Sequence, residues 1–128
     1  MILDTSAIAA IIFQEPGYES LHDRLGAAAT IGVGAATLVE AGIVLSARLR
    51  CDARDLLARF LLEVDARVIA FDEDHWMAAV DAWLHFGKGR HPARLNFGDC
   101  LAYATARLAR EPLLCVGEDF PKTDMELA

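Results

Sequence analysis

The chain begins with the stretch MILDTSAIAAIIF, residues 1–13, and this stretch decides the fold class. Met1–Asp4 has the composition of a short buried strand, and it leads into a turn at the next two residues. Ala7–Phe13 then follows a helical pattern that ends near a proline. A strand followed directly by a helix is typical of proteins that alternate the two elements around a parallel sheet.

The rest of the chain continues this alternation without an internal repeat, a low-complexity tract or a linker. Hydrophobic periodicity and capping residues predict helices over Tyr18–Ala28, Ala35–Arg50, a segment beginning at Asp52, Asp74–Phe86 and Asn96–Arg110, and strands over Thr30–Val33, Arg67–Phe71 and Leu113–Val116. We therefore expect an α/β fold with helices on both faces of a central parallel sheet. A length of 128 residues fits one domain, residues 1–128.

Two of the helices have apolar surfaces that predict how they pack. Ala35–Arg50 carries a single charged side chain, Glu40, before Ala47, so we expect a buried helix. In Asp74–Phe86 the large apolar residues Trp76, Val80, Trp83 and Leu84 are expected on the buried side. The two tryptophans indicate core or an interface rather than a platform for RNA bases. The helix that begins at Asp52 has Asp55 in a capping position.

The composition excludes several classes of protein. With 55% hydrophobic and 24% charged residues the chain is typical of a folded globular protein. No apolar run reaches the length of a membrane span, and no signal segment is present, so we expect a cytoplasmic location and no membrane partner. Cys51, Cys100 and Cys115 lack metal or disulfide spacing, and we expect buried, reduced thiols.

The net charge of −7 is opposite to that of a protein that binds nucleic acid mainly by releasing counterions. Action on RNA would therefore require metal ions and a local basic patch, and the acidic balance also suits a partner with a basic segment. One candidate patch exists, because Lys88, Arg90 and Arg94 place three of the twelve Lys and Arg residues in a loop with two glycines. This loop either contacts the RNA backbone or is an ordinary solvated surface.

Three acidic residues occupy unusual positions in the pattern. Asp4 ends the first strand, where open α/β sheets place their ligands, although it also suits a helix cap. Glu40 has apolar neighbours at helical spacing and is either buried with a partner or at the rim of its helix. Asp99 is the only charged residue in the first two turns of its helix, where an acid is stabilised by the backbone amides, and it can serve both roles.

These three acids together suggest a shared cation. Two like charges about 5 Å apart repel each other by roughly 3 kcal/mol at an effective dielectric constant near 20. Carboxylate oxygens without His or Cys at ligand spacing favour Mg²⁺ or Mn²⁺ over Zn²⁺. Such an ion activates water and stabilises a leaving oxygen, which is the chemistry of phosphodiester hydrolysis.

Four motifs in order carry a family resemblance: MILDTS around Asp4, TLVEA around Glu40, NFGDC around Asp99, and GEDF around Asp119. Over essentially the whole chain this sequence resembles the PIN-domain nucleases and, more narrowly, the VapC ribonuclease toxins of bacterial VapBC toxin–antitoxin pairs. The resemblance implies a three-layer α/β/α sandwich and an endoribonuclease that hydrolyses RNA phosphodiester bonds. It also implies a VapB-type antitoxin as partner, and toxin dimers are common in the family.

The same resemblance assigns roles to individual residues. Asp4 and Asp99 would hold Mg²⁺, or Mn²⁺ in its place, with Glu40 completing the catalytic pocket. Ser6 matches the family's small hydroxyl residue, and Asn96 its polar residue before the third acid. The fourth acid departs from the common pattern, because Gly117 stands where many relatives have an aspartate. We therefore choose Asp119 as the fourth acid, with Asp124 as the reserve and turn capping as the alternative role of Asp119.

Two other functions compete with this one. A phosphoaspartate mechanism at Asp4, as in haloacid-dehalogenase-type phosphatases, requires a second aspartate where this chain has Ser6. A PIN-like fold can also serve as a non-catalytic module that binds RNA or a protein. The residue pattern identifies neither the RNA that is cut nor the number of metal ions.

Overall fold

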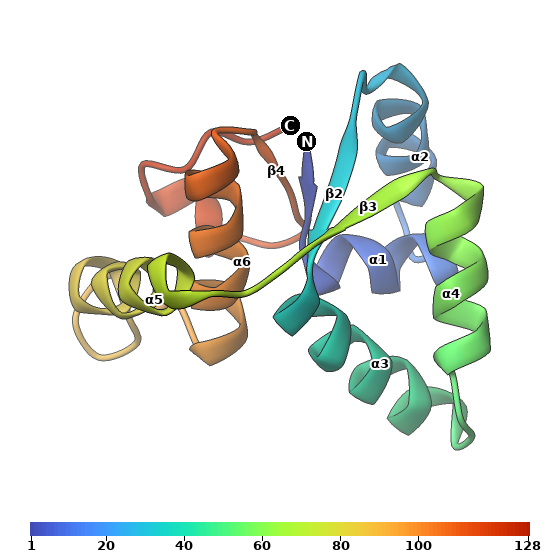
Figure 1. The fold of residues 1–128 in the computed structure, drawn as a ribbon, viewed down its shortest axis with the longest axis horizontal. Helices are drawn as coiled ribbons and strands as arrows, with labels where there is room; N and C mark the ends of the chain where they lie inside the picture. The colour runs from blue at the N-terminus through green and yellow to red at the C-terminus, as the bar shows by residue number, and fades with distance from the viewer.

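The computed structural model describes residues 1–128, and Figure 1 shows their path. The strands are β1 (Ile2–Leu3), β2 (Ile31–Gly34), β3 (Ala66–Ile69) and β4 (Leu113–Leu114). The helices are α1 (Thr5–Ile12), α2 (Tyr18–Ala27), α3 (Ala35–Leu49), α4 (Arg54–Glu63), α5 (Glu73–Phe86) and α6 (Phe97–Ala109), followed by the 3₁₀ turn η1 (Phe120–Lys122). No helix has the length and apolar character needed to cross a membrane.

The four strands form one parallel sheet in the order β3-β2-β1-β4. Ile2 of β1 is in register with Gly32 of β2 on one side and with Leu113 of β4 on the other. After β1 the chain adds β2 and β3 on one side of β1 within the sheet. The last strand, β4, pairs with the opposite side of β1, so the direction of strand addition reverses at β1. A ligand site in an open parallel sheet forms beyond the strand ends at such a reversal, and Asp4 follows β1 at this point.

Successive residues of β1 and β4 point to opposite faces of the sheet, and both faces are buried. Leu3 and Leu114 pack with α1, α2, α3 and α4, whereas Ile2 and Leu113 pack with α5 and α6. Figure 1 shows the same division, with α1 to α4 on one side of the strands and α5 and α6 on the other. This arrangement confirms the predicted three-layer α/β/α sandwich.

Two helices begin directly where a strand ends, without an intervening loop. Thr5 follows β1 after a single residue, and Ala35 follows β2 at once. In Figure 1, α1 and α3 both leave the lower end of the sheet, and α6 also begins at that level. The sequence therefore places the N-termini of three helices at the carboxyl edge of the sheet.

The predicted elements are all present, with small shifts at their ends. The helix expected to begin at Asp52 begins at Arg54, and its N-cap residue, Ala53, makes no side-chain capping bond. Asp52 instead accepts hydrogen bonds from Arg54, so the predicted capping role of Asp55 is wrong. Asn96, in contrast, caps α6 as predicted.

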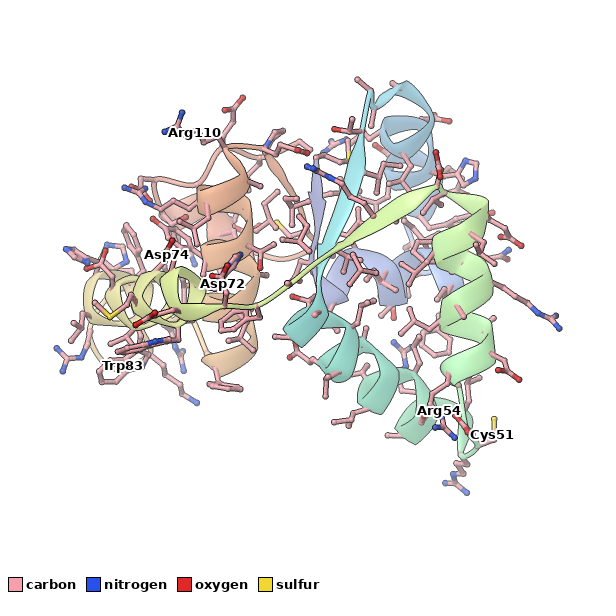
Figure 2. The ribbon with its side chains drawn as sticks, viewed as in Figure 1. Cys51, Arg54, Asp72, Asp74, Trp83 and Arg110 are labelled. Carbon is pink, nitrogen blue, oxygen red and sulfur yellow. The ribbon has the colours of Figure 1, made fainter.

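The predicted packing faces of α3 and α5 are wrong. Val39 and Ile43 of α3 are each 64% exposed, and only a narrow stripe that includes Ala41 and Leu45 is buried. On α5 the four large apolar residues named above are exposed by 40% or more, and the helix buries His75, Ala79 and Ala82. Small side chains allow α5 to lie close to α6, so the larger ones are left outside. Figure 2 shows Trp83 at the outer edge of α5.

The cysteines follow the prediction only in part. All three are unpaired thiols; Cys100 is buried, Cys115 is partly buried and Cys51 is exposed. Figure 2 shows Cys51 beside Arg54 in the connection between α3 and α4. The expectation of burial is wrong for Cys51 because this connection lies at the surface.

Candidate active site

Asp4 is the most buried of the candidate acids, with 4% of its surface exposed. Its Oδ2 accepts hydrogen bonds from the backbone N–H of Ser6 at 2.9 Å and from the Ser6 hydroxyl, so Asp4 caps α1. Its own N–H donates to the Leu114 carbonyl at 3.0 Å, which fixes the residue to β4. Burial raises the pKa of the Asp4 carboxyl, while the bonds from Ser6 act in the opposite direction.

Ser6 connects the segments that follow β1 and β4 at this end of the sheet. Its hydroxyl donates to Asp4 and accepts a hydrogen bond from the Val116 N–H at 2.9 Å. The segment after β4 is therefore tied to the first turn of α1. Ser6 lies where a residue that orients Asp4 must lie, as the sequence predicts.

Asp99 and Asn96 form a reciprocal capping box at the start of α6. The Asn96 Oδ1 accepts from the Asp99 N–H at 3.0 Å, and the Asp99 Oδ2 accepts from the Asn96 N–H at 2.8 Å. Oδ1 of Asp99 has no hydrogen bond within the protein and remains available to a ligand. Both roles considered for Asp99, helix cap and site residue, are compatible with this geometry.

The surroundings of Asp99 identify the acidic cluster, by which we mean Asp4, Glu40, Asp99 and Asp119. Burial raises the pKa of Asp99 to about 6, and the negative charges of Asp4, Asp119 and Glu40 act in the same direction. None of the four carboxylates forms a salt bridge with a Lys, Arg or His side chain. Four acids from separate parts of the chain therefore interact without a protein cation to balance them.

Glu40 reaches this cluster from α3. Its Oε2 accepts a hydrogen bond from the Thr5 hydroxyl at 2.8 Å, and its carboxylate lies against the backbone of Gly98. Glu40 is half-buried, and it faces the first turns of α1 and α6 rather than an apolar surface. Thr5 was expected from the sequence to orient Asp4 together with Ser6, but its hydroxyl donates to Glu40 instead. Gly98 was not predicted as a site residue, and the only local signal was its position beside Asp99.

Asp119 is exposed and lies just before η1. Its side chain makes no capping bond there, so turn capping does not account for it. Asp124, the reserve candidate, accepts a hydrogen bond from the Tyr103 hydroxyl at 2.7 Å and pairs with Arg107 at 3.3 Å. Asp124 does not contribute to the pKa shift of Asp99, whereas Asp119 does.

The donor set of the acidic cluster fits a hard divalent cation. All its ligating atoms are carboxylate oxygens, the ligands that Mg²⁺ and Mn²⁺ prefer. As the side chains stand, no group of three or more His, Cys, Asp or Glu residues lies close enough together to hold a metal ion. Burial is the main cause of the raised pKa of Asp99, and the repulsion by neighbouring carboxylates that adds to it is what a bound cation would relieve.

The basic segment, Gly87–Arg94, connects α5 to the cap of α6. Lys88, Arg90 and Arg94 are exposed and form no salt bridge. The Arg90 guanidinium lies 4.3 Å from the centre of the Trp83 ring. No hydrogen bond joins these residues to the acidic cluster, so their predicted contact with RNA stays a prediction.

A parallel sheet that gathers acidic residues at its carboxyl edge, each from a different part of the chain, defines an α/β protein with an acidic ligand site. Residues 1–126 match the PIN domain family, and the chain belongs to that family.

Within it, the relatives are VapC ribonucleases. Ribonuclease VapC36 of Mycobacterium tuberculosis is 46% identical over 131 residues, which cover 98% of this chain and 91% of that protein. Ribonuclease VapC42 of the same species is 39% identical over 129 residues, covering 100% and 98%.

Solved structures agree on the fold. The M. tuberculosis toxin VapC20, described as cleaving the sarcin–ricin loop, superposes with a TM-score of 0.76 at 23% identity, covering 99% of this chain and 97% of that one. VapBC2 of Rickettsia felis, bound to a DNA fragment from its promoter, gives 0.76 at 15% identity, covering 99% and 96%. The family predicted from four short motifs is thus confirmed.

Proposed function

We propose that this chain is the toxin of a type II toxin–antitoxin pair and acts as a metal-dependent endoribonuclease. The observation that carries the proposal is the acidic cluster, in which the negative charges of three carboxylates act on Asp99 and no member has a basic partner. The whole-length similarity to proteins named VapC ribonuclease supports RNA as the substrate. We also propose that residues 1–128 act as one domain.

Asp4 and Asp99 would hold the divalent cation, for which we propose Mg²⁺ with Mn²⁺ as a substitute. Both come from the ends of elements that the capping bonds keep rigid, and Glu40 and Asp119 complete the set. When bound, the cation would supply positive charge at the scissile phosphate and lower the pKa of an attacking water.

Other residues of the chain would orient the carboxylates of the acidic cluster and bind the RNA. Ser6 holds the Asp4 carboxylate through two hydrogen bonds, and Asn96 holds that of Asp99 through one. Asp119 is the exposed member of the set and would receive the proton of the attacking water. Lys88, Arg90 and Arg94 would bind RNA phosphates beside the cluster, since α6 begins where their segment ends.

We propose a VapB-type antitoxin with a basic segment as the protein partner, and a homodimer as the toxin's own assembly. The net charge of −7 suits such a segment. Of the structural neighbours, the R. felis protein is a VapBC assembly. The three unpaired thiols are consistent with the reducing conditions of the cytoplasm.

The first test removes the two proposed metal ligands. Asp4→Asn and Asp99→Asn keep the capping oxygen but lose the negative charge, so each should lower RNA cleavage by about 10²-fold or more. Cleavage of a cellular RNA extract by the purified wild type, with Mg²⁺, with Mn²⁺ and with EDTA, gives the comparison, and circular dichroism checks folding.

Full cleavage in EDTA would contradict metal dependence. Absence of cleavage by the wild type, together with no arrest of growth when it is expressed, would favour the non-catalytic alternative.

A further inference from the structure

Two residues outside the acidic cluster hold the Glu40 side chain, and they come from two other helices. Thr5, the first residue of α1, is buried, and its hydroxyl donates to Glu40 Oε2 at 2.8 Å. Gly98 lies in the first turn of α6, and its backbone is covered by the same carboxylate. Glu40 extends from α3, so three helices meet at one side chain.

The contact at Gly98 leaves no room for a side chain. A Cβ atom added there would lie 2.2 Å from Glu40 Oε1 and 2.5 Å from both Cδ and Oε2. These three atoms are the nearest neighbours, so the Glu40 carboxylate is the first group that the substitution would displace. Gly98 does not adopt a left-handed backbone conformation, so alanine satisfies the backbone at this position. Alanine would therefore displace the end of one flexible side chain and leave the helix intact.

We propose that Thr5 and Gly98 are positioning residues for Glu40, and that together they hold its carboxylate against the rest of the acidic cluster. Thr5 fixes one oxygen by a hydrogen bond, and the missing side chain of Gly98 provides the space that the carboxylate occupies. The positive ends of α1 and α6 favour the negative charge at this place. The inference rests on the proposed function, because it concerns the cation site of that function.

A double-mutant cycle tests the proposal. Mn²⁺ is titrated calorimetrically into metal-free protein for the wild type, Gly98→Ala, Glu40→Ala and the double variant. Gly98→Ala is expected to weaken Mn²⁺ binding by about 10-fold or more, which is the effect of losing an outer positioning contact. The double variant is expected to bind Mn²⁺ as Glu40→Ala does, since Gly98 acts through Glu40.

The matched control is Gly26→Ala. Gly26 is also helical, and a Cβ there has no atom within 4 Å, so this variant should bind Mn²⁺ as the wild type does. A second pair tests the other contact: Thr5→Val should weaken binding in the same way, and Thr5→Ser, which keeps the hydroxyl, should restore it. This pair decides the question if Gly98→Ala does not fold.

The outcomes distinguish a failure of this inference from a failure of the proposed function. Wild-type affinity in both Gly98→Ala and Thr5→Val overturns the inference alone, as does an additive cycle in which Gly98→Ala still weakens binding after Glu40 is gone. A wild type that neither binds Mn²⁺ nor cleaves RNA overturns the proposed function and the inference with it.

Discussion

Asp99 uses its two carboxylate oxygens differently. Oδ2 accepts the hydrogen bond from the Asn96 N–H in the capping box of α6, and Oδ1 has no hydrogen-bond partner within the protein. Burial and three neighbouring carboxylates raise its pKa to about 6. In the absence of a cation, the Asp99 carboxyl therefore gains or loses its proton at a pH slightly below neutral.

That pKa predicts how stability depends on pH. Because the folded state binds the Asp99 proton more tightly than the unfolded state, the stability contributed by this group falls as pH rises from about 4 to about 6. Asp99→Asn has no such charge, so at pH 7 without metal it should be more stable than the wild type by on the order of 1 kcal/mol, after allowance for solvent screening. Urea unfolding at pH 7 and pH 4 measures the difference, which should shrink at pH 4. A wild type that is the more stable protein at pH 7 would contradict this account.

Glu40 shows what local sequence patterns leave out. Spacing along one helix identified its apolar neighbours on α3, but the contacts that matter come from Thr5 and Gly98, 35 and 58 positions away. Asp4, Ser6, Asn96 and Asp99 were easier to predict, since each one's main partner lies within three residues. Contacts between distant elements depend on the packing of the whole fold.

At the scale of elements, α5 and α6 start in the same way. Asp72 and His75 form a capping box on α5, as Asn96 and Asp99 do on α6. Only the second box contains a residue of the acidic cluster. The two helices therefore provide a matched pair that separates stability from function.

We predict that Asn96→Ala and Asp72→Ala each lower the free energy of unfolding by about 1 kcal/mol, because each removes a side-chain cap. Only Asn96→Ala should also slow RNA cleavage, since it removes the Oδ1 that accepts from the Asp99 N–H and so loosens the helix turn that carries the Asp99 carboxylate. Chemical denaturation and cleavage rates, measured on both variants under conditions where both are folded, give the comparison. Equal losses of cleavage would show that Asn96 acts only through stability.

The sequence also predicts elements better than it predicts the faces they bury. Periodicity identified α3 and α5 almost to the residue, yet α3 was expected to be buried nearly all round and α5 to bury its large apolar side chains, and neither does. In α5, alanines face α6 because close approach of two helices favours small residues. An apolar pattern identifies a helix, but close packing between neighbouring helices determines which stripe is buried.

For RNA binding by the whole molecule, the distribution of charge over the surface matters more than the net charge. The net charge is −7, but the basic segment leads directly to the helix that carries Asp99. The sheet order brings Asp4 and the segment after β4 to the same edge, and no local pattern contains this information. The class of fold and the order of elements were predictable, and the residue pattern suggested a cation shared by Asp4, Glu40 and Asp99. The fourth acid, Asp119, followed only from the family resemblance.

We predict that the basic segment contributes a salt-dependent part of RNA binding. Lys88→Gln combined with Arg90→Gln should reduce the slope of log affinity against log salt by about 1.4, or about 0.7 for each phosphate contact to a single strand. Fluorescence anisotropy with a labelled RNA in Ca²⁺, at several salt concentrations, measures the slope. Arg59→Gln, which removes an exposed charge of α4 that forms no ion pair, is the control. An unchanged slope in the double variant would show that this segment is only a surface loop.

The hydrogen bond between Ser6 and Val116 spans 110 residues and has a consequence for synthesis of the protein. Asp4 is synthesised 110 residues before Leu114, to whose carbonyl its N–H donates. During translation the acidic edge therefore stays incomplete until the segment after β4 has been made. A nascent chain that ends before this segment lacks one wall of the site, so we expect it to have no RNA-cleaving activity.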